Sequence, residues 1–444
     1  MLSKLWLHAL LLGNGAMWSN PRLTAQQALG QIKMQQAAEN EPGERIEAEP
    51  PLVTIPRQAP PAISGEALSR GQLLGEIEEK TKRVRAFLTE RGYDAIVLTQ
   101  VRNFSWMTAG IADNQIVLGS EKGASSLVIT KDGRRFIVAS VSELPRLAAE
   151  SLSGLGYEPK GLAWTDTDLG GVVKKLVASE RVLSDTLIPG LDTADIVGLR
   201  SPLTDTEVVK LRWLAKHTAE AVVEVIEGLS PGVSERSIEA RASDALLRRN
   251  IRPTVLMVGT DERIQNYRHT PPTDFATLDT DVMITTCAKR WGLTVAMTRL
   301  VHFGDATADM QRKLTAAARV SATLQARLKP GKTAGELFAV MTQTYAEAGF
   351  PDEWRHHHQG GAIGYSEREW FALPQGPQRV TERQAFVWNP TVQGTKVEDT
   401  VLVTKNGVEN LTLTEGWPTV TTMVDGKAIR SPAILIKASA TARR

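Results

Sequence analysis

The sequence contains very little cysteine: Cys287 is the only one in 444 residues. No disulfide can therefore form within one chain, and cysteine usage does not indicate the redox compartment. An excess of one charge is also lacking, because 52 basic and 50 acidic residues leave a net charge of +2. This balance gives no reason to expect nucleic acid or an anionic membrane as a partner. With 42% apolar residues the composition is that of an ordinary globular enzyme, and the length allows two domains with full cores.

A long hydrophobic run is missing near the N-terminus as well. Lys4 is followed by the apolar stretch 5–12, which contains His8 and leads into the small residues 13–16. This stretch is too short to span a bilayer, for which about 20 residues are needed, so no membrane span is predicted. One positive charge, a short apolar region and small residues resemble a weak signal peptide. Alternatively, these residues precede the true start of the protein or form a short amphipathic helix, which leaves export and a cytoplasmic location both open.

Regular periodicity is absent from about residue 20 to residue 73. A proline-rich stretch covers residues 50–61, and no apolar period of 3.6 or two residues persists between the prolines. Such a composition is typical of a disordered tether. We therefore assign residues 1–73 to a signal-like segment and a Pro-rich tether.

The first globular pattern begins near Leu74. Apolar residues at helical spacing, including Ile77 and Leu88, predict an amphipathic helix that stops at Gly92. Strand-like runs follow, and the pair Asp132-Gly133 between two of them is typical of a β-hairpin. Helices and strands then alternate, which predicts an α/β domain covered on both faces. The predicted strands are 95–99, 126–130 and 136–139.

A second unit, assigned to residues 199–418, contains an internal repeat. The segments Leu229–Ser234 and Leu328–Thr333 both end one helix, turn through Pro-Gly and cap the next helix. Thr333 and Glu336 have the spacing of a capping box. Two related helix–strand halves are what a pseudo-twofold α+β domain needs. The predicted helices are 205–228, 236–249 and 334–348.

Four segments of this unit are distinctive: His269–Asp274, Val282–Arg299, Gly360–Gly364 and Thr395–Val403. In order and spacing they resemble the creatinase and Xaa-Pro aminopeptidase family, whose members share a pita-bread, peptidase M24-like domain. The helix–strand pattern of residues 76–189 is similar to the N-terminal domain of that family. The resemblance implies an α/β creatinase-like N-terminal domain over residues 74–198 and an α+β pita-bread C-terminal domain over residues 199–418. It leaves residues 419–444 as a C-terminal tail and implies a homodimer.

The same resemblance places the metal ligands of the family on mostly unsuitable residues. In its metallopeptidases two Asp, one His and two Glu hold a dinuclear metal centre. Here only the last Glu is matched. Ala and Gly offer no side-chain donor, and a single carboxylate binds two hard or borderline cations only weakly. We therefore expect no metal and no other cofactor. The corresponding positions, in chain order, are Thr285, Ala296, Gly361, Asn389 and Glu398.

Two histidines, His269 and His357, do fall at active-site positions of the family. Similar proteins, creatinase and ectoine hydrolase, cleave C–N bonds with histidines and carboxylates and without metal. By this resemblance we expect His269, His357 and Glu398 to be catalytic, because the reaction needs an imidazole that takes a proton from water and returns it to the leaving nitrogen. Alternatively, His269 caps a strand end or donates to a carbonyl, and Glu398 is a buried acid paired with Lys396.

The cationic residues that remain around the former metal-ligand positions of the family indicate the charge of the substrate. Lys396, Arg368 and Arg299 are retained where most carboxylates are gone. An uncompensated cationic cleft favours a ligand with a carboxylate or another anion. Asn389 and Thr285 add neutral hydrogen bonds. We expect all five residues to bind substrate.

The histidine run 356–358 allows a different interpretation. If the run is extended, His356 and His358 share one face and hold a single transition-metal ion, while His357 points the other way. No third ligand is visible nearby in the sequence. A solvated or hydrogen-bonded histidine cluster is the alternative.

Together these features predict a metal-independent hydrolase of a C–N bond, amide or peptide-like, in a small anionic amino-acid- or peptide-like substrate. One alternative is a catalytically inactive pita-bread domain that binds peptides or a partner protein. Another is an Xaa-Pro-type metallopeptidase with non-standard ligands.

Overall fold

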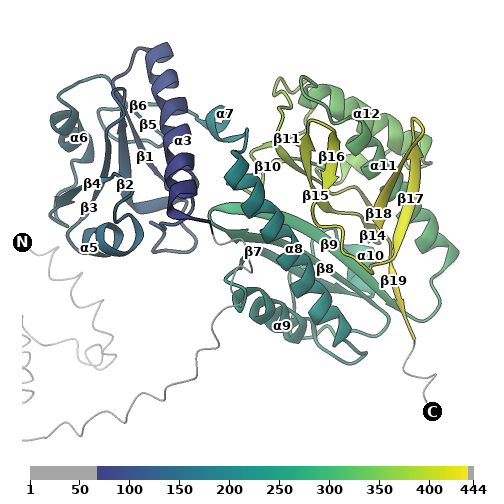
Figure 1. Cartoon of the computed structure of the whole chain (residues 1–444). Helices are drawn as coiled ribbons and strands as arrows, with labels where there is room; N and C mark the ends of the chain where they lie inside the picture. The colour runs from purple at the N-terminus through teal and green to yellow at the C-terminus, as the bar shows by residue number, and fades with distance from the viewer. Residues whose placement is uncertain (1–67, 439–444) are drawn as a thin grey trace, which may run out of the picture. The chain divides into compact units, whose positions relative to one another are not determined.

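The computed structural model describes residues 68–438 (Figure 1). The signal-like segment and nearly all of the predicted tether lie outside these residues. The first described element is helix α3, Arg70–Arg91, and Leu74, the predicted start of the first domain, lies within it. Ser69 caps this helix in a capping box with Gln72. Gly92 in the left-handed conformation ends it, as the sequence predicts.

The first domain is built on a six-stranded mixed sheet with the order β4-β3-β2-β1-β5-β6. Its strands are β1 Ala95–Gln100, β2 Lys122–Thr130, β3 Arg135–Ser140, β4 Glu158–Leu162, β5 Val182–Ser184 and β6 Asp192–Thr193. Strands β2 and β3 form the predicted antiparallel hairpin, with Ile129 opposite Arg135. Gly133 in its turn has a φ of 97°, a conformation that favours glycine. The hairpin prediction is thus confirmed.

Helices cover both faces of this sheet. The shorter ones are α4 Val101–Met107, α5 Leu144–Arg146, α6 Leu169–Val177 and α7 Val197–Arg200, with a π-helical turn at Leu147–Ser151. Alternation along β1 directs Ile96 and Leu98 into the core that contains Ile77 of α3. Val97 points the other way and packs in the core that contains Val173 of α6. The domain is therefore α/β, as predicted.

The second domain consists of two similar halves, each with two helices followed by three main antiparallel strands. The first half contains α8 Asp205–Glu227, α9 Glu235–Leu247, β7 Arg252–Thr260, β8 Asp281–Arg290 and β9 Leu293–Phe303. The second half contains α11 Ala308–Arg327, α12 Ala334–Glu347, β10 Gly360–Ile363, β12 Ala385–Trp388 and β15 Asp399–Thr404. Ser234 caps α9, and Thr333 caps α12 in a capping box with Glu336. The internal repeat predicted from the two Pro-Gly turns is confirmed.

Each half contributes one sheet. The shorter elements are α10 Glu262–Asn266, β11 Trp370–Phe371, β13 Thr391–Val392, β14 Thr395–Lys396, β16 Gly407–Asn410, β17 Thr419–Val424, β18 Lys427–Pro432, β19 Leu435–Lys437 and a 3₁₀ turn at Glu353–Arg355. One sheet has the order β19-β9-β8-β7 and the other the order β11-β10-β12-β15-β16. Helix α8 packs on β9 and helix α9 packs on β7, and Figure 1 shows both helices alongside the sheet that contains β7, β8 and β9.

The two sheets meet where β9 passes the bend before β15. Thr298 and Glu398 form an isolated antiparallel bridge, in which Thr298 N donates to Glu398 O at 3.1 Å. The Thr400 hydroxyl accepts from Ala296 N and donates to Ala296 O, both at 2.8 Å. The fold is thus an α/β creatinase-like N-terminal domain followed by an α+β pita-bread domain.

Residues 419–438 pair with each other and with the second domain. Strands β17 and β18 form an antiparallel hairpin, and β19 pairs parallel with β9, with Leu435 opposite Val301. Residues 419–444 are predicted as a tail, and the described part of this segment supplies the edge strand β19. The predicted domain boundaries stay predictions. Among residues 68–438 no helix has the length and apolar character needed to cross a membrane.

A buried network of charges ties α3 to α8. Glu76 accepts hydrogen bonds from Lys80 at 2.5 Å and from Lys210 at 2.8 Å. Glu207 pairs with Lys80 at 2.7 Å and accepts from the Tyr365 hydroxyl at 2.6 Å. These four charged side chains are at most 1% exposed, so two acids and two bases compensate each other away from water. Tyr365 extends the network to the loop between β10 and β11.

Candidate active site

Two histidines that are distant in sequence lie in contact. His269 follows α10 on a loop that continues into Pro271-Pro272, and His357 follows the 3₁₀ turn. Their Nε2 atoms are 3.0 Å apart and their rings are nearly perpendicular, at 87°. His358 lies against His357 with ring centroids 4.2 Å apart. The structure thus brings together the two histidines that the sequence analysis selected.

Asn389 holds the ring of His357. In its assigned orientation the Asn389 amide donates from Nδ2 to His357 Nδ1 at 3.4 Å. The proton of His357 then resides on Nε2 and is donated to His269 Nε2. Asn389 is 1% exposed, and its Oδ1 has no hydrogen-bond partner among residues 68–438. A buried acceptor without a partner favours a ligand that donates to it.

Both histidines favour the neutral form. Partial burial lowers the pKa of His269 below its ordinary value, and the positive charge of Lys396 lowers it further. Burial, again with Lys396, holds the pKa of His357 well below its usual range. Near pH 7 the pair is therefore uncharged, and one imidazole can accept a proton.

The one matched carboxylate, Glu398, is buried among cations. Lys396 Nζ lies 3.0 Å from Glu398 Oε2, and Arg368 Nη2 lies 3.7 Å from Oε1. The Thr298 hydroxyl donates to Oε2 at 2.6 Å, and the Thr285 hydroxyl lies 2.8 Å from that of Thr298. Burial raises the pKa of Glu398, but Lys396, Arg368 and the Thr298 hydroxyl outweigh burial and hold this pKa below its ordinary value. Glu398 is therefore ionised and paired with Lys396.

The residues at the metal positions of the family do not fit a dinuclear centre. The Thr285 hydroxyl is engaged by Thr298, and Ala296 supplies no side-chain donor. Gly361 also supplies no side-chain donor. The backbone of β11 leaves no room for a side chain at this position, because a Cβ there would lie 2.0 Å from Trp370 O. A histidine cannot be accommodated at this point without displacing β11.

The negative charge that metal ions would neutralise is already neutralised by side chains. Glu398 is 3% exposed, and its two cationic neighbours, Lys396 and Arg368, are 4% and 10% exposed. Two cations around one carboxylate leave a net charge of +1, which repels a further cation. Among residues 68–438 no group of three or more His, Cys, Asp or Glu side chains has a metal-binding arrangement.

Replacing Gly361 by alanine is expected to destabilise the protein. The new methyl group would meet Trp370 O at 2.0 Å and Phe371 Cα at 2.9 Å. Because both contacts are with backbone, no side-chain rotation relieves them, and we expect the free energy of unfolding to fall by about 1–3 kcal/mol. Gly198→Ala is the matched control, since nothing lies within 4 Å of a Cβ at that position. Denaturant unfolding of both variants measures the difference, and equal midpoints would contradict this packing.

Arg299 does not join the cluster, although the sequence analysis placed it there. Its side chain is fully buried, pairs through Nη1 with Asp399 at 3.1 Å, and donates from Nη2 to Thr412 O at 2.5 Å. The reason is the two-residue period of β9. Thr298 points toward Glu398, so the next residue, Arg299, points to the opposite face. Its observed partners are those of a structural ion pair.

The histidine run is not an extended strand. The 3₁₀ turn ends at Arg355, and His356, which caps it, is exposed. The rings of His357 and His358 lie next to each other with 30° between their planes. His356 and His358 therefore do not share a strand face, and a single metal ion held by these two has no geometric basis.

Two residues near Glu398, Thr298 and Cys287, were not predicted from the sequence as part of the site. Thr298 donates to Glu398, and Cys287 on β8 lies opposite Ala296. Burial raises the pKa of the Cys287 thiol to about 12, so it is not a thiolate nucleophile. The signal for Thr298 was spacing, because residues two apart on a strand share a face and Ala296 holds a metal position of the family.

Comparison with protein families gives a match over most of the second domain. Residues 210–405 match the model described as metallopeptidase family M24. Over 93 residues the chain is 34% identical to an Xaa-Pro dipeptidase of Pyrococcus horikoshii, an alignment that covers 20% of this chain and 26% of the dipeptidase. The chain thus spans about a quarter of the length of this curated relative.

Solved structures share the fold over a longer range. Dipeptidase PepE from Mycobacterium ulcerans has a TM-score of 0.67 at 18% identity, with 82% of this chain and 99% of that chain covered. The N-terminal domain of FACT complex subunit SPT16 from Cicer arietinum has a TM-score of 0.57 at 14% identity, with 76% and 96% covered. At these identities the likeness shows the fold alone, and this fold occurs both in a dipeptidase and in a subunit of a larger complex.

Proposed function

We propose that this chain, whose residues 210–405 are a domain of metallopeptidase family M24, is a hydrolase that cleaves a C–N bond without a metal ion. The substrate class is a small anionic molecule of amino-acid or peptide type that contains an amide or peptide-like bond. One observation carries the proposal. In place of a set of metal ligands, the site has a neutral His269–His357 pair close to the Lys396–Glu398 ion pair.

In this proposal His269 moves the proton. It accepts a proton from the attacking water, the water oxygen forms a bond to the carbonyl carbon, and the imidazolium returns the proton to the leaving nitrogen as the C–N bond breaks. In the free protein His269 Nε2 accepts from His357, so water must take the place of this hydrogen bond before the reaction. His357, held by Asn389, then donates its Nε2 proton to the oxygen on which negative charge develops.

Lys396 and Arg368 hold the anionic end of the substrate in the same proposal. With Glu398 they leave one uncompensated positive charge in a largely buried place, and Arg368 Nε is buried without a hydrogen-bond partner among residues 68–438. A carboxylate satisfies both the charge and the free donor. Asn389 Oδ1 accepts a substrate N–H, and Thr285 Oγ1, whose proton is donated to Thr298, accepts a further one.

Hydrolysis should survive a chelator. We expect a screen of dipeptides and N-acyl amino acids to find turnover that EDTA leaves unchanged, with an unchanged melting temperature, because no step needs a metal ion. The screen should be run in parallel on apo-protein supplied with Mn²⁺, Co²⁺ or Zn²⁺. Turnover that EDTA abolishes and metal restores would favour an Xaa-Pro-type metallopeptidase with non-standard ligands.

Acid should inactivate the enzyme only well below neutrality. The folded pKa of His269 lies below the ordinary histidine value of about 6.5, so its basic form persists under mildly acidic conditions. We expect the acid limb of the kcat/KM profile below pH 6.5. The unfolded chain binds protons at His269 and His357 near pH 6.5 and the folded one does not, so the free energy of unfolding should also fall as the pH drops below about 6.5. An acid limb above pH 6.5, or melts that do not change between pH 7 and 5, would contradict these shifts.

A catalytically inactive binding domain is the second candidate. It is favoured by the His269–His357 hydrogen bond, which occupies the proposed base, and by the same fold in a subunit of the FACT complex. Peptide binding that Lys396→Met weakens, without turnover by the wild-type protein in the same screen, would establish this alternative.

A further inference from the structure

A cavity lies at the C-terminal end of β8, near Lys289. Its volume is about 610 Å³, within the range of about 300–1,000 Å³ of small-molecule sites. Its walls come from the loop 111–121, from β7 and β8, and from the residues that follow Tyr365. Neither His269 nor Glu398 lines it. Lys289 in this cavity is four residues beyond Thr285, which corresponds to about 13 Å along a strand.

Five charged side chains line this cavity, and none forms an ion pair within 4.0 Å of another described residue. The two arginines hydrogen-bond to neutral amides instead, one to Gln100 at 2.7 Å and the other to Gln115 at 3.4 Å. Charges of both signs that form no ion pairs around one cavity favour a ligand that also carries both signs. The cations are Arg102, Arg252 and Lys289, and the acids are Glu121 and Glu367.

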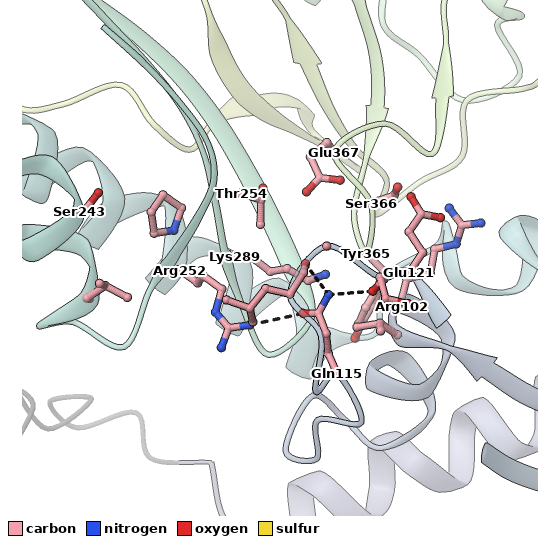
Figure 2. Close-up of a pocket in the computed structure, with 16 residues that line it drawn as sticks. Arg102, Gln115, Glu121, Ser243, Arg252, Thr254, Lys289, Tyr365, Ser366 and Glu367 are labelled. Carbon is pink, nitrogen blue, oxygen red and sulfur yellow. Dashed lines mark hydrogen bonds between the residues drawn. The ribbon is translucent and has the colours of Figure 1, made fainter. Parts of the chain in front are cut away.

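Lys289 and Glu367 face the centre of the cavity. Both are half-buried, and Figure 2 shows the Glu367 carboxylate above the Lys289 ammonium and the Gln115 amide. Burial lowers the pKa of Lys289, and the negative charge of Glu367 acts in the opposite direction. The two are nevertheless too far apart for an ion pair. A carboxylate placed on Lys289 and an ammonium placed on Glu367 would satisfy both ends at once.

Aliphatic side chains form another part of the wall. Leu118 is 68% exposed and Leu247 is 55% exposed, and Val101 and Pro253 lie on the same lining. Covering the two exposed leucines removes apolar surface from water, which favours a ligand with an aliphatic group.

We propose that this cavity binds a small zwitterion with an aliphatic group, the chemistry of an aliphatic amino acid or of a short aliphatic peptide. The carboxylate is held by Lys289 and Arg252, and the ammonium by Glu367. The aliphatic group covers Leu118 and Leu247. This binding does not depend on the hydrolysis proposed at His269.

Calorimetric titration of the full chain tests the site with L-leucine and L-leucyl-L-leucine and with two derivatives that each lack one charge. Lys289→Met should weaken binding of L-leucyl-L-leucine and of its N-acetyl derivative by about 10- to 100-fold, because both carry the carboxylate. Glu367→Gln should weaken L-leucyl-L-leucine and its amide to a similar extent, and should leave the N-acetyl derivative unchanged. Lys289→Arg keeps the charge and should retain most of the affinity.

Lys396→Met separates this cavity from the proposed active site, because it weakens only anion binding beside Glu398. In the Lys396→Met background, adding Lys289→Met should still weaken binding of L-leucyl-L-leucine by about 10- to 100-fold. Loss of binding in Lys396→Met, with full binding in Lys289→Met and Glu367→Gln, would overturn the proposal by placing the ligand at Glu398. Absence of binding of both leucine probes to the wild-type chain at millimolar concentration would overturn it as well. Neither result affects the hydrolysis proposal, which is tested by turnover.

Discussion

Replacement of His269 by alanine is expected to lower turnover by about 10²–10⁴-fold, the usual loss when a positioned acid–base is removed. Near neutral pH a metal-free hydrolase must activate water and protonate a poor nitrogen leaving group, and imidazole suits both steps. The fold should survive, because His269 lies on a loop and, within residues 68–438, its side chain hydrogen-bonds only to His357. Steady-state kinetics with a thermal melt of the same variant separate the two effects.

His356→Ala is the matched control for this experiment. His356 lies in the same histidine run but is exposed and does not belong to the contact pair. It should keep wild-type turnover. If His269→Ala hydrolyses a confirmed substrate at the wild-type rate, the creatinase-like mechanism is wrong. Lys396→Met should mainly raise KM, since in the proposal Lys396 binds substrate and does not move a proton.

The glutamine variant of Glu398 is expected to lose about 3–5 kcal/mol of unfolding free energy. Removing the carboxylate charge leaves Lys396 and Arg368, at 4% and 10% exposure, without a counter-charge. In the wild type the Thr298 hydroxyl donates to the Glu398 carboxylate at 2.6 Å. The neutral amide oxygen of glutamine accepts a weaker hydrogen bond from this hydroxyl. Since the folded pKa of Glu398 lies below its ordinary value, the stabilisation is complete above about pH 4.3 and is lost as the pH falls through the folded pKa. Denaturant unfolding measures both effects.

Two further variants serve as controls for the stability loss expected in Glu398→Gln. Glu409→Gln breaks an exposed pair with Arg212, whose side chains are 39% and 49% exposed, and should cost less than about 1 kcal/mol. The double variant Glu398→Gln/Lys396→Met should regain part of the lost stability, because one unpaired cation is removed with the acid. A loss of less than about 0.5 kcal/mol in Glu398→Gln would mean that Glu398 is solvated.

Much of the fold was predictable because its signals are local. The helix stop at Gly92, the hairpin at Asp132-Gly133 and the capping box at Thr333 and Glu336 each depend on a few adjacent residues. Segment 419–437 was less predictable. The parallel pairing of β19 with β9 joins residues far apart in the chain, and no short-range sequence pattern predicts it.

The candidate site was predictable where the family resemblance fixed a position, as for His269 and His357. It was less predictable where the direction of a side chain mattered. Arg299 and Thr298 are neighbours, and only the register of β9 against β8 and the bend at Glu398 decide which of them faces Glu398. The cavity at Lys289 combines distant segments, so its unpaired charges became visible only in three dimensions.

Metal analysis of the purified protein tests the central claim most directly. The wild-type chain should be stripped with a chelator, incubated with Mn²⁺, Co²⁺ or Zn²⁺, freed of excess metal and analysed for metal content alongside its activity. Because Lys396 and Arg368 already neutralise Glu398, and Thr285, Ala296 and Gly361 offer no metal cage, we expect no stoichiometric metal and unchanged activity. Two tightly bound metal ions per chain, with activity that depends on them, would contradict the account.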